Sequence, residues 1–264
     1  KKLRKKLPNV SIMKNHELKN IDVIFTALPH GEAHLISKKI RSNSVLIDLS
    51  ADFRIDNKTI FEKWYKLPHQ ATKEQKKSIY GLSEINRSLI KKSNFIACPG
   101  CYPTSILLPL LPLVKNKLIN TNSIKADSKS GYSGAGKKTT DKKLYPNINE
   151  NISIYGVGQH RHMPEIDQEL SKSSKKKIKI SFTPHLIPTF RGILSTIYLD
   201  LPKGIKIKKV KDCLLNFYKK EKFVNVVNSK EMINTNRVLN TNNCNIAVYQ
   251  TRFDSQIIIA SSLD

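Results

Sequence analysis

The residue of this chain best suited to chemistry is Cys101, which lies in the stretch Pro99–Ser105 between two apolar segments. The segment before it, Phe95–Cys98, predicts a short buried strand, and the segment after it, Ile106–Val114, predicts a helix that begins near Cys101. A proline is tolerated in the first turn of a helix, so Pro103 fits this interpretation. A thiol at the start of a helix lies at the positive end of the helix dipole, which favours the nucleophilic thiolate. We therefore predict that Cys101 attacks a carbonyl carbon and that nearby backbone N–H groups bind the resulting oxyanion.

Two other interpretations of Cys101 start from residue type alone. A buried cysteine is often an inert part of the core. Cys98 and Cys101 also form a Cys-x-x-Cys pair, which is typical of disulfide or metal chemistry. A zinc site would need a second pair of this kind, but Cys213 and Cys244 stand alone, so we predict no metal site. Redox chemistry stays open at this point.

A second group of chemically useful residues is His160-Arg161-His162, which comes just before Pro164 and Glu165. The last two residues suit the first turn of a helix, so the group is expected at a helix N-terminus. A histidine near its usual pKa can accept or donate a proton, and an arginine can bind an anion. We take His160 as the first candidate for proton transfer and His162 as the second. The alternative is a surface loop with no role in chemistry.

The elements that must position these residues fall into two groups. In the first part of the chain, apolar runs that predict buried parallel strands (21–28, 44–49 and 95–98) alternate with helical spacing (32–40). Beyond Val114, strands outnumber helices: the predicted strands are 123–130, 178–183, 193–201, 244–249 and 256–260, with a turn-rich link at 184–192 and a helix at 210–220.

This pattern predicts an α/β protein with two domains. Domain 1–100 is expected to hold a doubly wound, Rossmann-like parallel sheet, and domain 101–264 to be an α+β catalytic and dimerisation domain with a mainly antiparallel sheet. No glycine-rich dinucleotide loop precedes Ile21. We therefore expect the first domain to be N-terminally incomplete, with its first strand-turn-helix unit upstream of Lys1.

The net charge, taken by itself, suggests a protein of another class, one that binds nucleic acid. The chain has 46 basic and 21 acidic residues, and its formal net charge of +25 is typical of nucleic-acid binding. However, only eight basic residues are arginines, and the lysine clusters lack the interleaved aromatic residues of a single-strand platform. A basic nucleic-acid-binding module is therefore kept as the alternative from another class. With no membrane-length apolar run, no visible secretory signal and four cysteines without a framework pattern, we expect a cytoplasmic protein.

Several segments, in order along the chain, together resemble one family: the N-acetyl-γ-glutamyl-phosphate reductases of arginine biosynthesis, relatives of aspartate-semialdehyde dehydrogenase. The matching segments cover nearly the whole chain and are 25–31, 48–54, 80–84, 99–104, 130–137, 160–166 and 182–192. The chain departs from the family at Cys98, where the family usually has Asn, and at Lys137, where it has Arg. The glycine-rich nucleotide loop and the final helical segment of the family are not found, so we expect this segment to lack both ends of the family's chain.

The resemblance implies an oxidoreductase that uses NADPH to reduce N-acetyl-γ-glutamyl phosphate to N-acetylglutamate semialdehyde, with release of phosphate and a thioester intermediate on Cys101. Arg54, Arg161 and Arg191 are the expected substrate-binding residues, with interdomain ion pairs as the alternative. The alternatives within the enzyme class are reductases of aminoadipyl phosphate or aspartyl phosphate.

The resemblance also implies contacts to NADP from both domains. The expected cofactor-binding residues are Leu28, Pro29, His30, Gly31, Ser50, Ala51, Ser133, Gly134 and Gly136. As partners we expect a small acyl-phosphate substrate and a second copy of the chain, in a homodimer or homotetramer, with no nucleic acid and no membrane.

Overall fold

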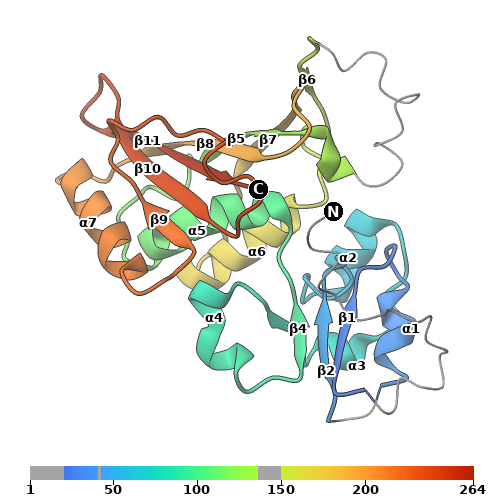
Figure 1. The fold of residues 1–264 in the computed structure, drawn as a ribbon. Coiled ribbons are helices and arrows are strands. Elements are labelled where there is room, and N and C mark those ends of the chain that lie inside the picture. Colours follow the sequence, from blue (N-terminus) through green and yellow to red (C-terminus); the bar gives the residue numbers. More distant parts are fainter. Residues whose placement is uncertain (1–20, 41–42, 136–149) are drawn as a thin grey trace. The chain divides into compact units, whose positions relative to one another are not determined.

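The computed structural model describes residues 21–40, 43–135 and 150–264, which fall into two compact units. The first unit ends at Cys98 and the second begins at Pro99, with the short segment Lys63–Tyr65 grouped with the second. Each unit contains its own sheet and helices (Figure 1).

The first unit is built on a parallel sheet with strand order β1-β2-β4-β3. Its strands are β1 (Val23–Thr26), β2 (Val45–Asp48), β3 (Ile79–Tyr80) and β4 (Phe95–Ala97), and its helices are α1 (Ala33–Ser37), α2 (Lys58–Tyr65), α3 (Thr72–Gln75) and α4 (Ser83–Ile90). Ile24, Leu46, Phe53 and Phe95 form the centre of its core. The predicted Rossmann-like parallel sheet is confirmed.

Strand β1 differs from its expected burial on both faces. Ile24 and Thr26 are buried, but Val23 is 47% and Phe25 is 67% exposed. Among the described strands β1 lies at the edge of the sheet, and the described residues cover only one of its faces. An uninterrupted apolar run therefore does not by itself show that both faces of a strand are covered.

The second unit is built on a larger sheet with strand order β6-β7-β5-β8-β11-β10-β9. Its strands are β5 (Lys125–Ser130), β6 (Ser153–Ile154), β7 (Ser181–Leu186), β8 (Ile193–Asp200), β9 (Val224–Val226), β10 (Cys244–Gln250) and β11 (Gln256–Leu263). Among the described strands of this second sheet, only the pairs β5–β7 and β9–β10 are parallel. The predicted mainly antiparallel α+β domain is confirmed.

Helix α5 (Cys101–Lys115) is the centre of the second unit. It contacts α6 (Met163–Ser174), α7 (Ile207–Tyr218) and strands β8 and β11, and Figure 1 shows α5 and α6 side by side on one face of the sheet. Pro112 inside α5 has no N–H to donate to the carbonyl of Leu108, and the hydroxyl of Tyr218 on α7 donates to that carbonyl instead. The neighbouring helix thus supplies a hydrogen bond that the proline removes.

Strand β7 continues through Pro184, where the sequence predicted a turn-rich link. Pro184 pairs with Ser128 of β5, and its carbonyl accepts a hydrogen bond from the N–H of Tyr155 at 3.1 Å, on the β6 side. In a strand the N and O atoms of one residue point to the same side, so the missing N–H of Pro184 faces β6 and leaves the β5 ladder intact. Proline near a sheet edge therefore did not end the strand.

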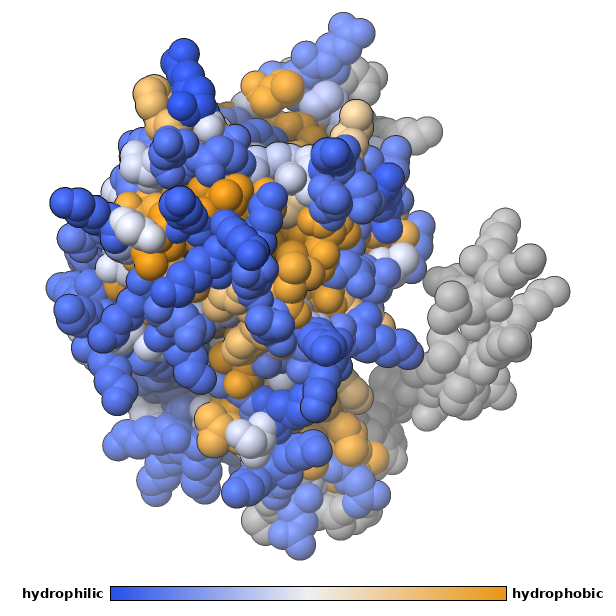
Figure 2. Space-filling view, turned by 90° about the vertical axis from the view of Figure 1, so that its left-hand side faces the viewer, coloured by the Kyte–Doolittle hydropathy of each residue, from blue (hydrophilic) through white to orange (hydrophobic). Residues whose placement is uncertain are grey.

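Hydrophilic residues cover most of the face in Figure 2, with apolar patches between them, as the high lysine content leads one to expect. None of the helices in the described part of the chain is both long enough and apolar enough to cross a membrane.

Candidate active site

Cys101 is the first residue of α5 and is exposed. Gly100 precedes it in an extended conformation and has no side chain to cap the helix. The N–H of Gly100 instead donates to Oε1 of Glu165 at 2.8 Å, and Glu165 is fully buried in the first turn of α6. The start of α5 is thereby joined to the start of α6, where the histidines lie.

Tyr102 links the cysteine to both histidines within the second unit. Its ring lies edge-on to His160 and to His162, with centroid separations of 5.6 and 6.0 Å. The two histidine rings are 4.8 Å apart. Since Tyr102 follows Cys101 directly, both imidazoles lie beside the first turn of the helix that carries the thiol.

The electrostatic state of His160 follows from its surroundings. Burial, and to a lesser degree the positive charge of Arg161, lowers the pKa of His160 to about 4. Its Nδ1 accepts a hydrogen bond from the backbone N–H of His162 at 3.2 Å. The neutral ring therefore carries its proton on Nε2, so His160 at neutral pH is a hydrogen-bond donor through that atom.

Tyr155 is a member of this cluster that the sequence did not single out. Its hydroxyl is 3.0 Å from the hydroxyl of Tyr102, and its ring is 5.5 Å from that of His160. Burial raises the pKa of both tyrosines, and the negative charge of a Cys101 thiolate raises both further. The two hydroxyls thus stay protonated at neutral pH. The sequence feature that could have pointed to Tyr155 is its position directly before a Gly-x-Gly turn.

The three arginines lie in different surroundings. Arg54, in the first unit, is 8% exposed and donates from Nε to the carbonyl of Cys98 and from Nη2 to that of Leu49, at 2.7 and 2.8 Å. It thereby joins the chain just after β2 to the chain just after β4. Arg161 is exposed between the two histidines. Arg191 is half-exposed and forms an ion pair with Asp264 at 2.5 Å.

The loop after β1 contains four of the predicted cofactor-binding residues. Leu28, Pro29 and His30 are at least partly exposed, while the N–H of Gly31 donates to both carboxylate oxygens of the fully buried Asp52 at 2.8 and 2.9 Å. Asp52 also accepts from the N–H of Ala33 at 3.1 Å. The Asp52 carboxylate therefore accepts hydrogen bonds from the first N–H groups at the start of α1.

Ser50 and Ala51, the predicted cofactor-binding residues after β2, are both buried. The hydroxyl of Ser50 donates to Asp48 at 2.8 Å. The hydroxyl of Ser50 also accepts a hydrogen bond from the N–H of Asp52 at 3.3 Å, so the backbone after the strand is fixed by hydrogen bonds.

The glycine-rich segment of the second unit is held against the segment before β8. The N–H groups of Tyr132 and Ser133 donate to the carbonyls of Thr189 and Phe190 at 3.0 and 2.8 Å. Gly134 has open space where a Cβ would lie. Gly136 and Lys137 lie outside the described residues.

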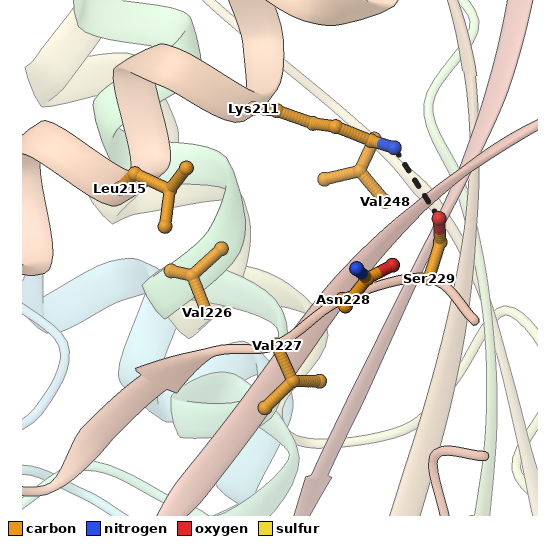
Figure 3. A pocket seen from close by; sticks show the side chains of 7 residues that line it. All are labelled: Lys211, Leu215, Val226, Val227, Asn228, Ser229 and Val248. Atoms are coloured by element: carbon orange, nitrogen blue, oxygen red, sulfur yellow. Dashed lines mark hydrogen bonds between the residues drawn. The ribbon is translucent and has the colours of Figure 1, made fainter. Parts of the chain in front are cut away.

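A separate cavity of about 290 Å³ lies between α7, β9 and β10 (Figure 3). It is lined by Lys211, Leu215, Val226, Val227, Asn228, Ser229 and Val248. The only polar contact drawn is that of the Lys211 ammonium with the Ser229 hydroxyl, at 3.3 Å. The polar side chains of this lining are Lys211, Asn228 and Ser229, and none of them is a cysteine at the start of a helix, so Cys101 stays the candidate nucleophile. Among the described residues, no group of three His, Cys, Asp or Glu is arranged to hold a metal ion.

Comparison with known proteins gives two family-model matches that together span most of the chain. Residues 2–93 match "Semialdehyde dehydrogenase, NAD binding domain", and residues 101–264 match "Semialdehyde dehydrogenase, dimerisation domain". A probable chloroplastic N-acetyl-γ-glutamyl-phosphate reductase of Arabidopsis thaliana is 43% identical over 98% of this chain and 65% of its own length. The N-acetyl-γ-glutamyl-phosphate reductase of Alkaliphilus metalliredigens is 42% identical over 96% of this chain and 74% of its own length.

The chain belongs to the N-acetyl-γ-glutamyl-phosphate reductase family. The resemblance drawn from the sequence motifs is thus confirmed. The chain spans about two thirds to three quarters of the length of these curated relatives.

Solved structures agree on the fold of this family. Aspartate-semialdehyde dehydrogenase from Francisella tularensis has a TM-score of 0.70 at 14% identity, over 95% of this chain and 79% of that one. The Candida albicans aspartate-semialdehyde dehydrogenase determined with NADP has a TM-score of 0.62 at 16% identity, over 97% of this chain and 78% of that one.

Proposed function

We propose that this protein reduces N-acetyl-γ-glutamyl phosphate to N-acetylglutamate semialdehyde in arginine biosynthesis, with NADPH as reductant and release of phosphate. The observation that carries the proposal is the position of Cys101 at the first residue of a buried helix, beside a ring that contacts both His160 and His162. The reaction named by the curated relatives requires a nucleophile and proton-transfer groups in this arrangement.

In the first step the Cys101 thiolate attacks the γ-carbonyl carbon of the acyl phosphate. The new C–S bond forms as the C–O bond to phosphate breaks, so phosphate leaves with that electron pair and a thioester remains on Sγ. The first turn of α5 lowers the barrier by directing its positive dipole end at the sulfur and at the developing oxyanion. Dividing the reduction into acyl transfer and hydride addition makes each step easier.

The two histidines take different roles in this proposal. His160 is neutral above about pH 4 and holds its proton on Nε2, so it donates a hydrogen bond to the substrate oxygen. His162 then receives the thiol proton of Cys101 and passes it to the oxygen of the departing phosphate. This assignment reverses the order that the sequence suggested, because the N–H of His162 already uses Nδ1 of His160.

A nicotinamide cofactor, when bound, would supply the hydride for reduction of the thioester carbon. The residues present fit such a group at the loop after β1, where Leu28, Pro29 and His30 are open and Gly31 is held by Asp52. Ser50 and Ala51, which directly precede Asp52, are proposed to line the cofactor path, and Ser133, Gly134 and Gly136 are proposed to contact the cofactor from the second domain. After hydride addition, breaking of the C–S bond releases the semialdehyde and returns the electron pair to Sγ.

We assign substrate binding to Arg161 and Arg191, whose exposed guanidinium groups can pair with the substrate carboxylate or the phosphate. Arg54 is proposed to act on the substrate phosphate as well, with two of its donors already fixed by the carbonyls of Leu49 and Cys98.

The remaining parts of the proposal concern the assembly and its location. We propose that domain 1–100 binds NADP, that domain 101–264 carries catalysis and self-association, and that the chain forms a homodimer or homotetramer. The matched dimerisation-domain description supports self-association. A cytoplasmic location is proposed because all four cysteines are free thiols.

The acyl-transfer step provides a test that needs no cofactor. The purified chain is mixed with N-acetyl-γ-glutamyl phosphate, and the mass of the intact protein and the free phosphate are measured together. We expect one acyl group on Cys101, released by hydroxylamine, with one phosphate per chain. Cys101→Ser should lose both signals, and Cys213→Ser, a half-buried cysteine on α7, should keep both.

Acylation of Cys213 in place of Cys101, or phosphate release that persists in Cys101→Ser, would refute the covalent route. The same assay with aspartyl phosphate and aminoadipyl phosphate decides the substrate, because the proposed enzyme should be acylated at least about tenfold faster by the N-acetylglutamyl compound.

A further inference from the structure

Three fully buried serines form a chain of hydroxyl groups behind the helix that carries Cys101. The Oγ of Ser105 on α5 is 2.7 Å from the Oγ of Ser195 on β8, which is 2.7 Å from the Oγ of Ser128 on β5. Each of these serines has 0% exposure. Ser105 also donates to the carbonyl of Tyr102 at 2.8 Å. The chain therefore joins two neighbouring strands to the first turn of α5.

The number of protons sets the direction of this chain. A serine hydroxyl has one hydrogen, and Ser105 uses its hydrogen on the carbonyl of Tyr102. The hydrogen between Ser105 and Ser195 must therefore come from Ser195, and the one between Ser195 and Ser128 from Ser128. All three bonds point the same way, from the sheet to the backbone of Tyr102, and bonds in such a chain strengthen one another.

The chain of serine hydroxyls ends beside the residues proposed for catalysis. Tyr102 follows Cys101, and its ring contacts both His160 and His162. The carbonyl that accepts the last hydrogen bond of the serine chain thus belongs to Tyr102, the residue that links the thiol to the two imidazoles. In an apolar core, valine or alanine would pack at these positions without the cost of burying three hydroxyl groups.

We propose that Ser128, Ser195 and Ser105 are positioning residues that hold the first turn of α5 against the sheet and so aim the thiol of Cys101 at its reaction partner. The inference rests on the proposed role of Cys101 as the nucleophile. Without the serine hydrogen bonds the first turn of α5 can shift. The positive end of the helix dipole then no longer holds the thiolate in one place.

Alkylation of Cys101 by iodoacetamide tests this without substrate or cofactor. The rate constant for the Cys101 peptide is measured by mass spectrometry from pH 5 to 9 in the full chain, with the Cys213 peptide as an internal reference. We expect Ser195→Ala to slow alkylation of Cys101 at pH 7 about three- to tenfold and to move the midpoint of its pH profile upward, a range set by the loss of one or two buried hydrogen bonds. Ser195→Thr, which keeps a hydroxyl, should recover most of the rate.

Ser261→Ala is the matched control. Ser261 is also fully buried and pairs directly with Ser195 across β8 and β11, but its hydroxyl contacts the thiol of Cys244 at 3.4 Å. This variant should lose similar stability and keep the alkylation rate of Cys101 within about twofold. Equal rates in Ser195→Ala and Ser261→Ala would overturn the proposal.

Ser128→Ala covers the case in which Ser195→Ala does not fold, as judged by circular dichroism. It removes the outermost donor and leaves the bond between Ser195 and Ser105, so a smaller change in the same direction is expected, and an unchanged pH profile overturns the proposal. If the alkylation difference is found while acyl phosphate fails to modify Cys101, the proposed function fails and the positioning role stands.

Discussion

Among single residues, the four cysteines show how surroundings separate a reactive thiol from inert ones. Cys101 is exposed at a helix N-terminus, whereas Cys244 is buried. Burial raises the pKa of Cys98, against the nearby charge of Arg54, and also raises the pKa of Cys213. Thiolate chemistry is therefore expected at Cys101 before any other cysteine.

The proton position on His160 is a testable prediction at the same scale. With the protein labelled with ¹⁵N-histidine, two-dimensional NMR should show His160 at pH 7 as a neutral ring protonated on Nε2, because Nδ1 accepts the N–H of His162. Its titration midpoint should lie at about 4. The signals of the exposed His30 are recorded in the same spectra for comparison.

A midpoint for His160 near the ordinary histidine value, or a proton on Nδ1, would contradict this assignment. His160 would then return to the acid–base role that the sequence suggested for it.

At the scale of elements, the segments that frame the site are held by short backbone contacts. Gly131 follows β5 directly, and its N–H donates to the carbonyl of Gly192 at 2.9 Å. A Cβ on Gly131 would lie 2.6 Å from the backbone N of Arg191 and 2.7 Å from the carbonyl of Phe190. Only glycine allows the two segments to approach so closely.

We therefore expect Gly131→Ala to destabilise the second unit by about 1–3 kcal/mol, the usual cost of overpacking against backbone. Gly134→Ala, three residues along the same segment, has nothing within 4 Å of the added Cβ and should change the free energy of unfolding by less than about 0.5 kcal/mol. Urea denaturation followed by circular dichroism compares the two. An equal loss of unfolding free energy in the two variants would show that the backbone around Gly131 accommodates the added Cβ without cost.

At the scale of the whole molecule, the proposed nucleophile and both histidines belong to one unit, and the proposed nucleotide-binding loop belongs to the other. The acyl-transfer chemistry is thus assembled within residues 99–264, with its own sheet and core. Each unit has its own ionisable groups in the interior. We therefore expect the stability of each unit to depend on pH through its own groups.

The first unit contains a pH-dependent contribution to stability from His69. Burial, and then the charge of His34, lowers the pKa of His69 from 6.5 to about 4, and both ring nitrogens are hydrogen-bonded to the backbone of Asp52 and Ala71. Because the native state prefers the neutral ring, this contribution is complete above pH 6.5 and is lost as the pH falls towards 4.

The loss due to His69 should reach about 3 kcal/mol at most over that interval. Burial also raises the pKa of Asp52, which acts in the opposite direction. The His69 contribution is therefore measured as the difference between the wild type and His69→Gln in urea denaturation at pH 7.5, 6, 5 and 4.5. The difference should shrink steadily as the pH falls, and a constant difference would show that His69 does not titrate with unfolding.

Much of the molecule followed from the sequence alone. The apolar run after Cys101 predicted α5, alternation predicted β8 and the first part of β7, and the ordered motifs predicted the family, because these features depend on neighbouring residues and on periodicity. The short elements between residues 55 and 94 were not predicted, since segments of two to eight residues carry too little pattern. β7 was predicted to stop before Pro184 because edge position is not visible in a sequence.

The sequence by itself determined the candidate nucleophile, the histidine pair and the two-part fold. Only the tertiary structure decided how they work together: which nitrogen of His160 holds the proton, that Glu165 joins the starts of two helices, and that Tyr155 lies beside Tyr102. It also decided that three serines far apart in the chain share one line of hydrogen bonds. The physical reason is that hydrogen bonds and burial depend on partners distant in sequence, whereas helix and strand patterns depend on near neighbours.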